Sequence, residues 1–324
     1  MDDLKLLGGL RADAPEPGLD RLDALRARAL RRRRARLAPP LFLMAAATGV
    51  AVVVAGGVGA PVPDAPTTAR PVVTAGIRQM NAEVVLRRAA RVAERGAPVP
   101  AARDDQWMYW KLLVQNGDDP APVAEEYWHR FDGTAQSSRR AQGGMEHQAI
   151  EPEPGDDQLT PREFAAEFAE LATDPARLLD RVQNDPVWKA DGEHEDARAF
   201  RVFSVFLYQE VPLPPKLRGA MFRALAEIPG VRVDADVRDA AGRTGIGVAF
   251  EGDVPGSGVR RDLNGQVTTR SYLIFDDTTY EFIGRRVERF KNELIGTRLM
   301  RAGTEFVSAV VATGVVDEPG QLPG

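Results

Sequence analysis

The sequence predicts an α+β domain in which helices pack on one face of a mostly antiparallel, curved sheet. Three observations lead to this prediction. Residues 106–140 are aromatic and β-prone, residues 160–228 carry helix caps and helical apolar spacing, and residues 231–316 return to strand patterns. Strands followed by helices and then by more strands are typical of helices segregated to one face of an antiparallel sheet.

The domain is predicted to begin with one helix followed by aromatic strands. Asn81 is suited to cap a helix over 81–94, and Gly96 follows its end. Alternating aromatic and polar side chains, bounded by turn residues, then predict strands. The strands are expected over 106–115, 125–131 and 135–140, and the polar, proline-rich stretch 139–155 is expected to be a loop.

A block of helices is predicted next. Thr160-Pro161-Arg162-Glu163 is a capping box with proline at the first helical position, which is a strong start signal. Asp174-Pro175 and Pro214-Pro215 start two further helices. The apolar stretch 197–210 between them is compatible with either a helix or a strand.

The last third of the chain is predicted to form strands. Apolar and charged residues alternate from Val231 to Arg238, which places Asp234 on the polar side of its strand. Further strands are expected over 246–250, 272–275, 279–285 and 306–316. The valine-rich stretch 306–316 is too short to span a bilayer as a helix and is therefore predicted to be a core strand.

Composition excludes several classes of function. Residues 1–40 carry ten Lys and Arg against six Asp and Glu, a net charge of +4. Since the whole chain has a net charge of −5, the remainder has a net charge of −9. An acidic domain is a poor surface for nucleic acid, and no nucleic-acid partner is predicted. The chain has no cysteine, so disulfides and thiolate metal sites are excluded.

Residues 41–60 form an apolar stretch without charged or amide side chains. As a helix it would be about 30 Å long, the thickness of a bilayer core. Basic residues gather just before it, and the first one after it is Arg70, which predicts a cytoplasmic N-terminus and a single-pass cell-membrane protein. The topogenic residues are Arg31, Arg32, Arg33, Arg34 and Arg36. A cleaved signal peptide and a buried soluble helix are the alternatives.

Four segments follow from this topology: a cytoplasmic tail (1–40), a transmembrane helix (41–60), a proline-rich linker (61–79) and an extracytoplasmic α+β domain (80–324). Leucines at helical spacing within 1–36 make this part of the tail a candidate docking segment for a cytoplasmic regulatory protein. An unstructured leader, or a segment lying on the inner leaflet, would explain the same leucines.

The candidate chemical groups do not form a catalytic, cofactor or metal site. The three histidines, His129, His147 and His194, fall on separate predicted elements. The aspartates of Asp234-x-Asp236 and Asp276-Asp277 are neighbours on a strand and in a hairpin turn, whereas a glycosidase needs carboxyl groups that face each other across a cleft. We therefore expect a protein that is not an enzyme.

Several short segments of the sequence resemble those of a family of actinobacterial single-pass membrane proteins. They include residues 10–17, Trp107-x-Tyr109, the stretches 229–231 and 239–243, and residues 275–280. The resemblance implies an extracytoplasmic domain like the half-open sheets of LolA and RseB. It also implies the topology of membrane anti-sigma factors, although the tail lacks the zinc-binding His and Cys motif of many such proteins.

The sequence thus favours a binding or signalling module whose extracytoplasmic domain holds an apolar ligand or an envelope protein. The alternative is a structural envelope anchor without a signalling role. Aromatic residues of opposing elements are predicted to line an apolar trough, and a closed core would use the same residues. They are Trp107, Tyr109, Trp110, Phe203, Phe206 and Phe222.

Overall fold

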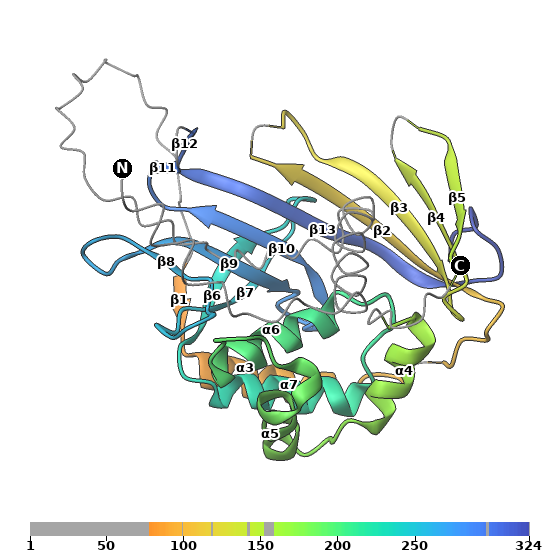
Figure 1. Ribbon diagram of the computed structural model, residues 1–324, viewed down its shortest axis with the longest axis horizontal. Coiled ribbons are helices and arrows are strands. Elements are labelled where there is room, and N and C mark those ends of the chain that lie inside the picture. Colours follow the sequence, from red (N-terminus) through yellow and green to blue (C-terminus); the bar gives the residue numbers. More distant parts are fainter. Residues whose placement is uncertain are drawn as a thin grey trace, which may run out of the picture. The chain divides into compact units, whose positions relative to one another are not determined.

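An eleven-stranded antiparallel sheet carries the fold (Figure 1). The computed structural model describes residues 78–98, 100–117, 119–140, 143–151, 159–295 and 298–323, which all belong to one compact unit, 63–324. The predicted tail, transmembrane helix and nearly all of the linker lie outside the described residues. None of the described helices is long and apolar enough to cross a membrane.

The strand order is β1-β6-β7-β9-β10-β13-β2-β3-β4-β5, with β8 paired to β9 and a separate ribbon of β11 and β12. Their bounds are β1 Arg78–Met80, β2 Trp107–Asn116, β3 Val123–Arg130, β4 Ala135–Arg140, β5 Met145–Ala149, β6 Val231–Arg238, β7 Thr244–Phe250, β8 Arg260–Arg261, β9 Val267–Phe275, β10 Phe282–Arg289, β11 Glu293–Ile295, β12 Arg298–Met300 and β13 Gly303–Val316. The long strand β13 joins the two halves of the sheet because it pairs with β10 on one side and β2 on the other. A register shift between Val310 and Ala312 interrupts its pairing with β2, as in a β-bulge, which typically bends a strand.

Local sequence signals decide where the helices begin. The Asn81 side chain accepts a hydrogen bond from the Val84 amide (3.1 Å) at the start of α3, and the predicted capping box of Thr160 and Glu163 starts α4. Proline occupies the first turn of α4, α5 and α7, where no amide hydrogen is needed. The bounds are α3 Ala82–Ala93, α4 Pro161–Glu170, α5 Pro175–Asn184, the short 3-10 helix η2 Pro186–Trp188, α6 Glu195–Leu207 and α7 Pro215–Glu227.

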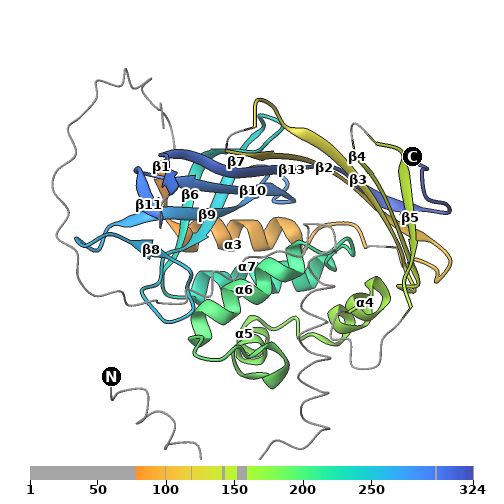
Figure 2. The same ribbon diagram turned by 45° about the horizontal axis from the view of Figure 1, so that its top comes forward.

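All five α-helices of the described residues lie on one side of the curved sheet (Figure 2). We call this side the inner face and the opposite side the outer face. The helices and the inner face of β6, β7 and β9 enclose the largest hydrophobic core, which contains Phe168, Phe203, Phe206 and Phe222. The predicted α+β class, with a large curved antiparallel sheet and helices beside it, is confirmed at this level.

The structure corrects several predicted elements. The predicted loop over 139–155 is wrong in part because β5 lies within it, and the short strands β1, β8, β11 and β12 were not predicted. The ambiguous stretch 197–210 forms most of helix α6. Asp234, expected on the polar side of its strand, is fully buried instead. Its carboxylate accepts hydrogen bonds from the Tyr272 hydroxyl and the Arg232 guanidinium (both 2.8 Å), so partners from the sheet satisfy it.

Candidate functional site

The inner face of the sheet is divided into two halves. The helical core takes its buried strand side chains from β6, β7 and β9 and includes none from β13, β2, β3 or β4 among the described residues. His129 of β3 pairs with Glu210, which follows α6, so His129 lies on the helix side of the sheet. Side chains alternate between the two faces of a strand, and every second residue of β3 therefore lies on this side too. The residues of β2 that pair with them share the same face. Four of these are buried apolar or aromatic side chains: Met108, Trp110, Leu112 and Tyr127. We call these four residues the aromatic face.

Trp110 lies at the middle of the aromatic face and has an unsatisfied donor. Its side chain is only 4% exposed, and its indole Nε1 has no hydrogen-bond partner among the described residues. Leaving a buried donor unpaired costs about 1–3 kcal/mol, so such a group in a folded protein needs an explanation. The aromatic face therefore combines buried apolar side chains with one buried N–H group that has no acceptor among the described residues.

Arg285 of β10 lies on the same inner face, next to the end of α6. Its guanidinium stands 4.8 Å from the ring centroid of Tyr208 and 5.7 Å from that of Phe306. The described residues supply it with no carboxylate partner, and burial lowers the pKa of Arg285 below its ordinary value. The Tyr208 hydroxyl is also buried without a hydrogen-bond partner in the described chain. The Arg285 guanidinium and the Tyr208 hydroxyl are thus two further polar groups on this side of the sheet that could bind a partner.

The ion pair of His129 and Glu210 fixes the segment after α6 to strand β3. The His129 Nδ1 and Glu210 Oε1 atoms are 2.8 Å apart, and both side chains are nearly buried. Burial opposes the charge of His129, but the charge and hydrogen bond of Glu210 outweigh it and raise the pKa of His129 above 6.5. The pKa of Glu210 is lowered below 4.5, because the charge and hydrogen bond of His129 outweigh the opposing effect of its burial.

This pair predicts how the stability of the domain depends on pH. A raised folded-state pKa means that the contribution of His129 is complete below pH 6.5 and is lost as pH rises through the raised value. The contribution of Glu210 is present above pH 4.5 and is lost as pH falls through its lowered pKa. We expect the urea midpoint to fall as pH rises above 6.5.

The double variant His129→Gln/Glu210→Gln is the matched control, since two amides keep a neutral hydrogen bond without titrating. Urea unfolding followed by circular dichroism at several pH values measures the slope for both proteins. An equal slope in the wild type and the double variant would assign the pH dependence to other groups.

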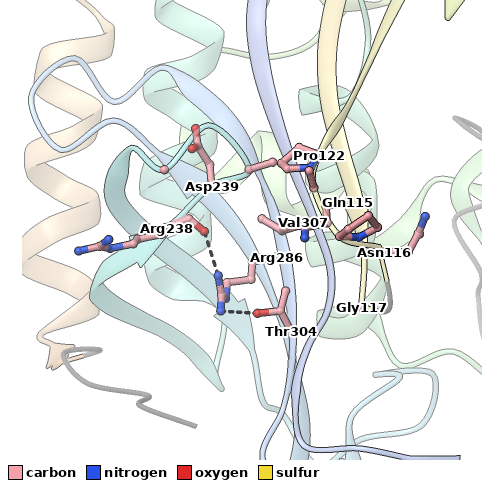
Figure 3. Close-up of a pocket in the computed structure, with 13 residues that line it drawn as sticks. Gln115, Asn116, Gly117, Pro122, Arg238, Asp239, Arg286, Thr304 and Val307 are labelled. Atoms are coloured by element: carbon pink, nitrogen blue, oxygen red, sulfur yellow. Dashed lines mark hydrogen bonds between the residues drawn. The ribbon is translucent and has the colours of Figure 1, made fainter. Parts of the chain in front are cut away.

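A half-open cavity of about 510 Å³ lies on the outer face, between the β2–β3 connection and the β6–β7 turn (Figure 3). The Arg286 guanidinium crosses it, held by the Glu288 carboxylate (2.8 Å), the Arg238 carbonyl (3.4 Å) and the Thr304 hydroxyl. The Arg238 guanidinium points away from this contact (Figure 3). The lining residues are Gln115, Asn116, Gly117, Pro120, Ala121, Pro122, Arg238, Asp239, Ala240, Gly242, Arg286, Thr304 and Val307.

Asp239, the acidic residue that lines this cavity, is hydrogen-bonded within the β6–β7 turn. One carboxylate oxygen of Asp239 accepts from the amides of Ala241 and Arg243 (both 2.9 Å), and the other accepts from the Arg243 guanidinium (2.6 Å). Arg286 is likewise neutralised by Glu288. Within its lining residues the cavity therefore presents no pair of free acid and base groups for proton transfer.

The structure separates the six aromatic residues predicted to line a trough. Phe203, Phe206 and Phe222 belong to the closed helical core. Trp107 and Tyr109 lie on the outer face, where the Tyr109 ring is 5.1 Å from that of Trp128. Of the six, only Trp110 lies on the aromatic face.

Sequence reasoning missed the other members of the inner face. The alternation of Met108, Trp110 and Leu112 with Tyr109 was visible in the sequence, and it correctly indicates a strand with two buried faces. It does not indicate which face receives the helices. The pairing of His129 with Glu210 and the position of Arg285 beside Tyr208 depend on tertiary packing, and the sequence carries no signal for them.

The other candidate chemical groups have structural partners. His194 caps α6 by accepting a hydrogen bond from the Asp196 amide (3.2 Å). The Ser137 hydroxyl pairs with His147 (2.8 Å), and Asp276 accepts from the Thr279 amide (2.7 Å) within its turn. No cluster of metal-ligating side chains is found in the described part of the chain. The topogenic arginines lie outside that part.

Comparison with known proteins gives little further information. No family model matches the chain, and no curated protein matches its sequence. One solved structure, the Pseudomonas aeruginosa MucA/MucB complex, resembles the chain with 13% sequence identity and a TM-score of 0.26. The match covers 76% of this chain and 59% of that one. A TM-score this low does not establish a shared fold, so the assignment of function depends on the geometry described above.

Proposed function

We propose that the chain is a membrane-anchored binding module. Residues 41–60 would hold it in the cell membrane as a single helix, and the arginines that precede this segment would keep the N-terminus in the cytoplasm. The described domain would then lie outside the cell membrane. In this proposal residues 1–36 are available to a cytoplasmic regulatory protein. Binding of a molecule to the external domain would change the interaction of this protein with residues 1–36.

The aromatic face is the proposed binding surface. The observation that carries this proposal is Trp110, a buried aromatic side chain outside the helical core whose N–H has no partner in the described chain. A bound molecule that inserts beside Met108, Leu112 and Tyr127 and offers an acceptor to Trp110 would satisfy this buried donor. This chemistry fits an acyl chain, or an apolar protein segment with a backbone carbonyl.

Arg285 and Tyr208 extend the proposed surface with polar groups. A guanidinium between two rings and without a carboxylate partner among the described residues favours an anionic group, and a free hydroxyl favours a further acceptor. An amphipathic partner with an acidic end would match the order of these groups along the inner face.

A binding role is favoured over catalysis because the buried acids considered above, and His194, have structural partners. Asp234, Asp239 and Glu210 each pair with a cation, and His194 caps a helix. Catalytic groups need a lone pair or a proton directed at a substrate, and these groups direct theirs at their own fold.

Substitution of Trp110 tests the proposal. We expect Trp110→Ala to weaken binding of the uncharged apolar dye N-phenyl-1-naphthylamine about thirtyfold, as for a buried aromatic anchor worth about 2 kcal/mol. Dye fluorescence titrated with the compact unit 63–324 gives the dissociation constant.

Trp107→Ala is the matched control, because it removes the same side chain from the same strand on the outer face. Its dye affinity should equal that of the wild type. Equal affinities for all three proteins, or no dye binding by the wild type, would remove the binding role and favour a structural anchor protein.

A further inference from the structure

We infer that the outer face carries a peptide-binding site, which a segment of the chain itself occupies in this structure. The segment is residues 317–323, which follow β13, and we call it the strap. The partner that fits the site is a segment of another protein with a Pro-Gly turn and a second proline, as in Pro319-Gly320-Gln321-Leu322-Pro323. The strap opens to admit it. This site lies on the opposite side of the sheet from the aromatic face, so the inference does not rest on the proposed function.

The strap reverses the direction of the chain after β13. The Gln321 amide donates to the Glu318 carbonyl (3.3 Å), and Gly320 has a φ of +93°, as in a type II turn with proline at its second position. In both views the chain turns back beside β5 at this point (Figures 1 and 2). Of the seven strap residues, Pro319 and Pro323 are half-buried and the other five are exposed. The two prolines are therefore the strap side chains that pack on the domain.

A row of outer-face residues across the sheet receives the strap. The register pairs Gly314 of β13 with Tyr109 of β2, and Tyr109 with Trp128 of β3, so all three lie on the same face. The Trp128 side chain is fully buried, and its indole Nε1 donates to the Gln321 carbonyl (3.0 Å). A methyl group on Gly314 would lie 2.5 Å from Cβ of Pro323. The absence of a side chain at Gly314 therefore provides the space for this proline.

Contacts outside the strap hold the site in place. The Tyr109 ring centroid is 5.1 Å from that of Trp128, and the Arg139 guanidinium lies 5.3 Å from the Trp128 ring centroid. Glu126 fixes both neighbours, because its carboxylate accepts from the Tyr109 hydroxyl (2.7 Å) and from the Arg139 guanidinium (2.6 Å). The position of the indole therefore does not depend on the strap, and release of the strap would leave a formed site.

Few contacts hold the strap closed. Strand β13 ends at Val316, so the strap has no place in the pairing of strands. Asp317 accepts hydrogen bonds from Arg103 and Gln106 (both 3.0 Å), but its side chain is 68% exposed, and an exposed ion pair contributes little to stability. A segment with few buried contacts opens at a much lower free energy than the whole domain. A partner segment that makes the same contact with Trp128 can therefore replace it.

Another protein is a better source of this segment than a second copy of the chain. Exchange of straps between two copies gains no contact, because each strap already makes these contacts within its own chain. A segment of another protein can be longer than the strap and can add contacts along the same strands. It competes with a ligand that is tethered beside the site, at an effective concentration on the order of millimolar.

A fluorescent peptide with the sequence of residues 317–323 tests the site in the full-length chain. Fluorescence anisotropy gives the dissociation constant of the peptide. In the chain, Gly320→Val places a β-branched residue at a positive φ and so opens the strap without changing the site. We expect this variant to bind the peptide about tenfold more tightly than the wild type, because its own strap no longer competes.

Gly314→Ala also releases the strap, but it fills the space that Pro323 needs within the site. It should therefore bind the peptide at least about tenfold more weakly than Gly320→Val. Since both variants release the strap, the difference between them measures the site itself. Gly144→Ala is the matched control, because it adds the same methyl group where no atom lies within 4 Å, and it should bind like the wild type.

A strap with a purely structural role predicts a different result. The wild type would then fail to bind the peptide at any concentration, and Gly320→Val would lower the urea midpoint without a gain in affinity. Either result would overturn the proposal, as would equal affinities of Gly320→Val and Gly314→Ala. Concentration-dependent dimers of Gly320→Val in analytical ultracentrifugation, absent from the wild type, would assign the site to a second copy and overturn its assignment to another protein.

Discussion

Phe206→Ala is expected to lower the free energy of unfolding by about 3–5 kcal/mol. The side chain is 1% exposed and lies at the centre of an aromatic cluster in the helical core. Its ring centroid is 5.3 Å from that of Phe168 and 5.5 Å from that of Trp188. Alanine would leave a cavity between three helical elements that cannot all move together, so little of the lost contact is recovered.

Urea unfolding of the compact unit 63–324 measures this loss. Val187→Ala, which shortens an exposed side chain near the same helices, should change the free energy of unfolding by less than about 0.5 kcal/mol. A loss below about 1 kcal/mol in Phe206→Ala, together with weakened dye binding, would mean that Phe206 lines an open trough and not a closed core.

Asp234→Asn is expected to destabilise the domain by about 3–5 kcal/mol, because it removes a fully buried negative charge from between two partly buried arginines. The wild-type carboxylate has no exposed surface and accepts from Arg232 and from the Tyr272 hydroxyl, with the Arg270 guanidinium 3.5 Å away. Asparagine keeps the shape of the side chain but turns one acceptor into a donor that faces these donors.

Thermal and urea unfolding of Asp234→Asn are compared with those of Asp253→Asn. Asp253 also pairs with an arginine, Arg261, but its side chain is 88% exposed, and such surface pairs contribute about 0–1 kcal/mol. If the two variants lost the same small amount, the network around Asp234 would be solvated and would not act as a buried charge cluster.

The sequence predicts the helices of this fold better than its sheet. The caps at Asn81, Thr160 and Asp174 each act on the amide three residues away, so the signal and its effect lie in one short stretch. Strand β5 is five residues long, mostly polar and held by β4, and its own residues carry no alternating pattern. Short edge strands of this kind are defined by their partner more than by their sequence.

The candidate site shows the same limit at the level of side chains. Alternation predicts that Trp110 and Tyr109 lie on opposite faces of one strand, but only the position of the helices decides which one faces inward. Asp234 was expected to face water because it is one of the charged residues that alternate with apolar residues along its strand. It is buried because Arg232, Arg270 and Tyr272 surround it on the outer face, and this set of partners comes from two strands that are distant in sequence.

The position of β13 has a consequence for how the domain is made. Strand β2, near the start of the described chain, can complete its pairing only with β13, the last strand, and the side chains of Gln106 and Asp317 that meet beside this pair are 211 residues apart. Until β13 arrives, β2 and β10 both have unpaired edges, which can join the edges of other chains. Closing so long a loop is slow, and the sheet forms as one piece only after most of the polypeptide has been delivered. Residues 303–316 must therefore emerge during synthesis before the two halves can form one continuous sheet.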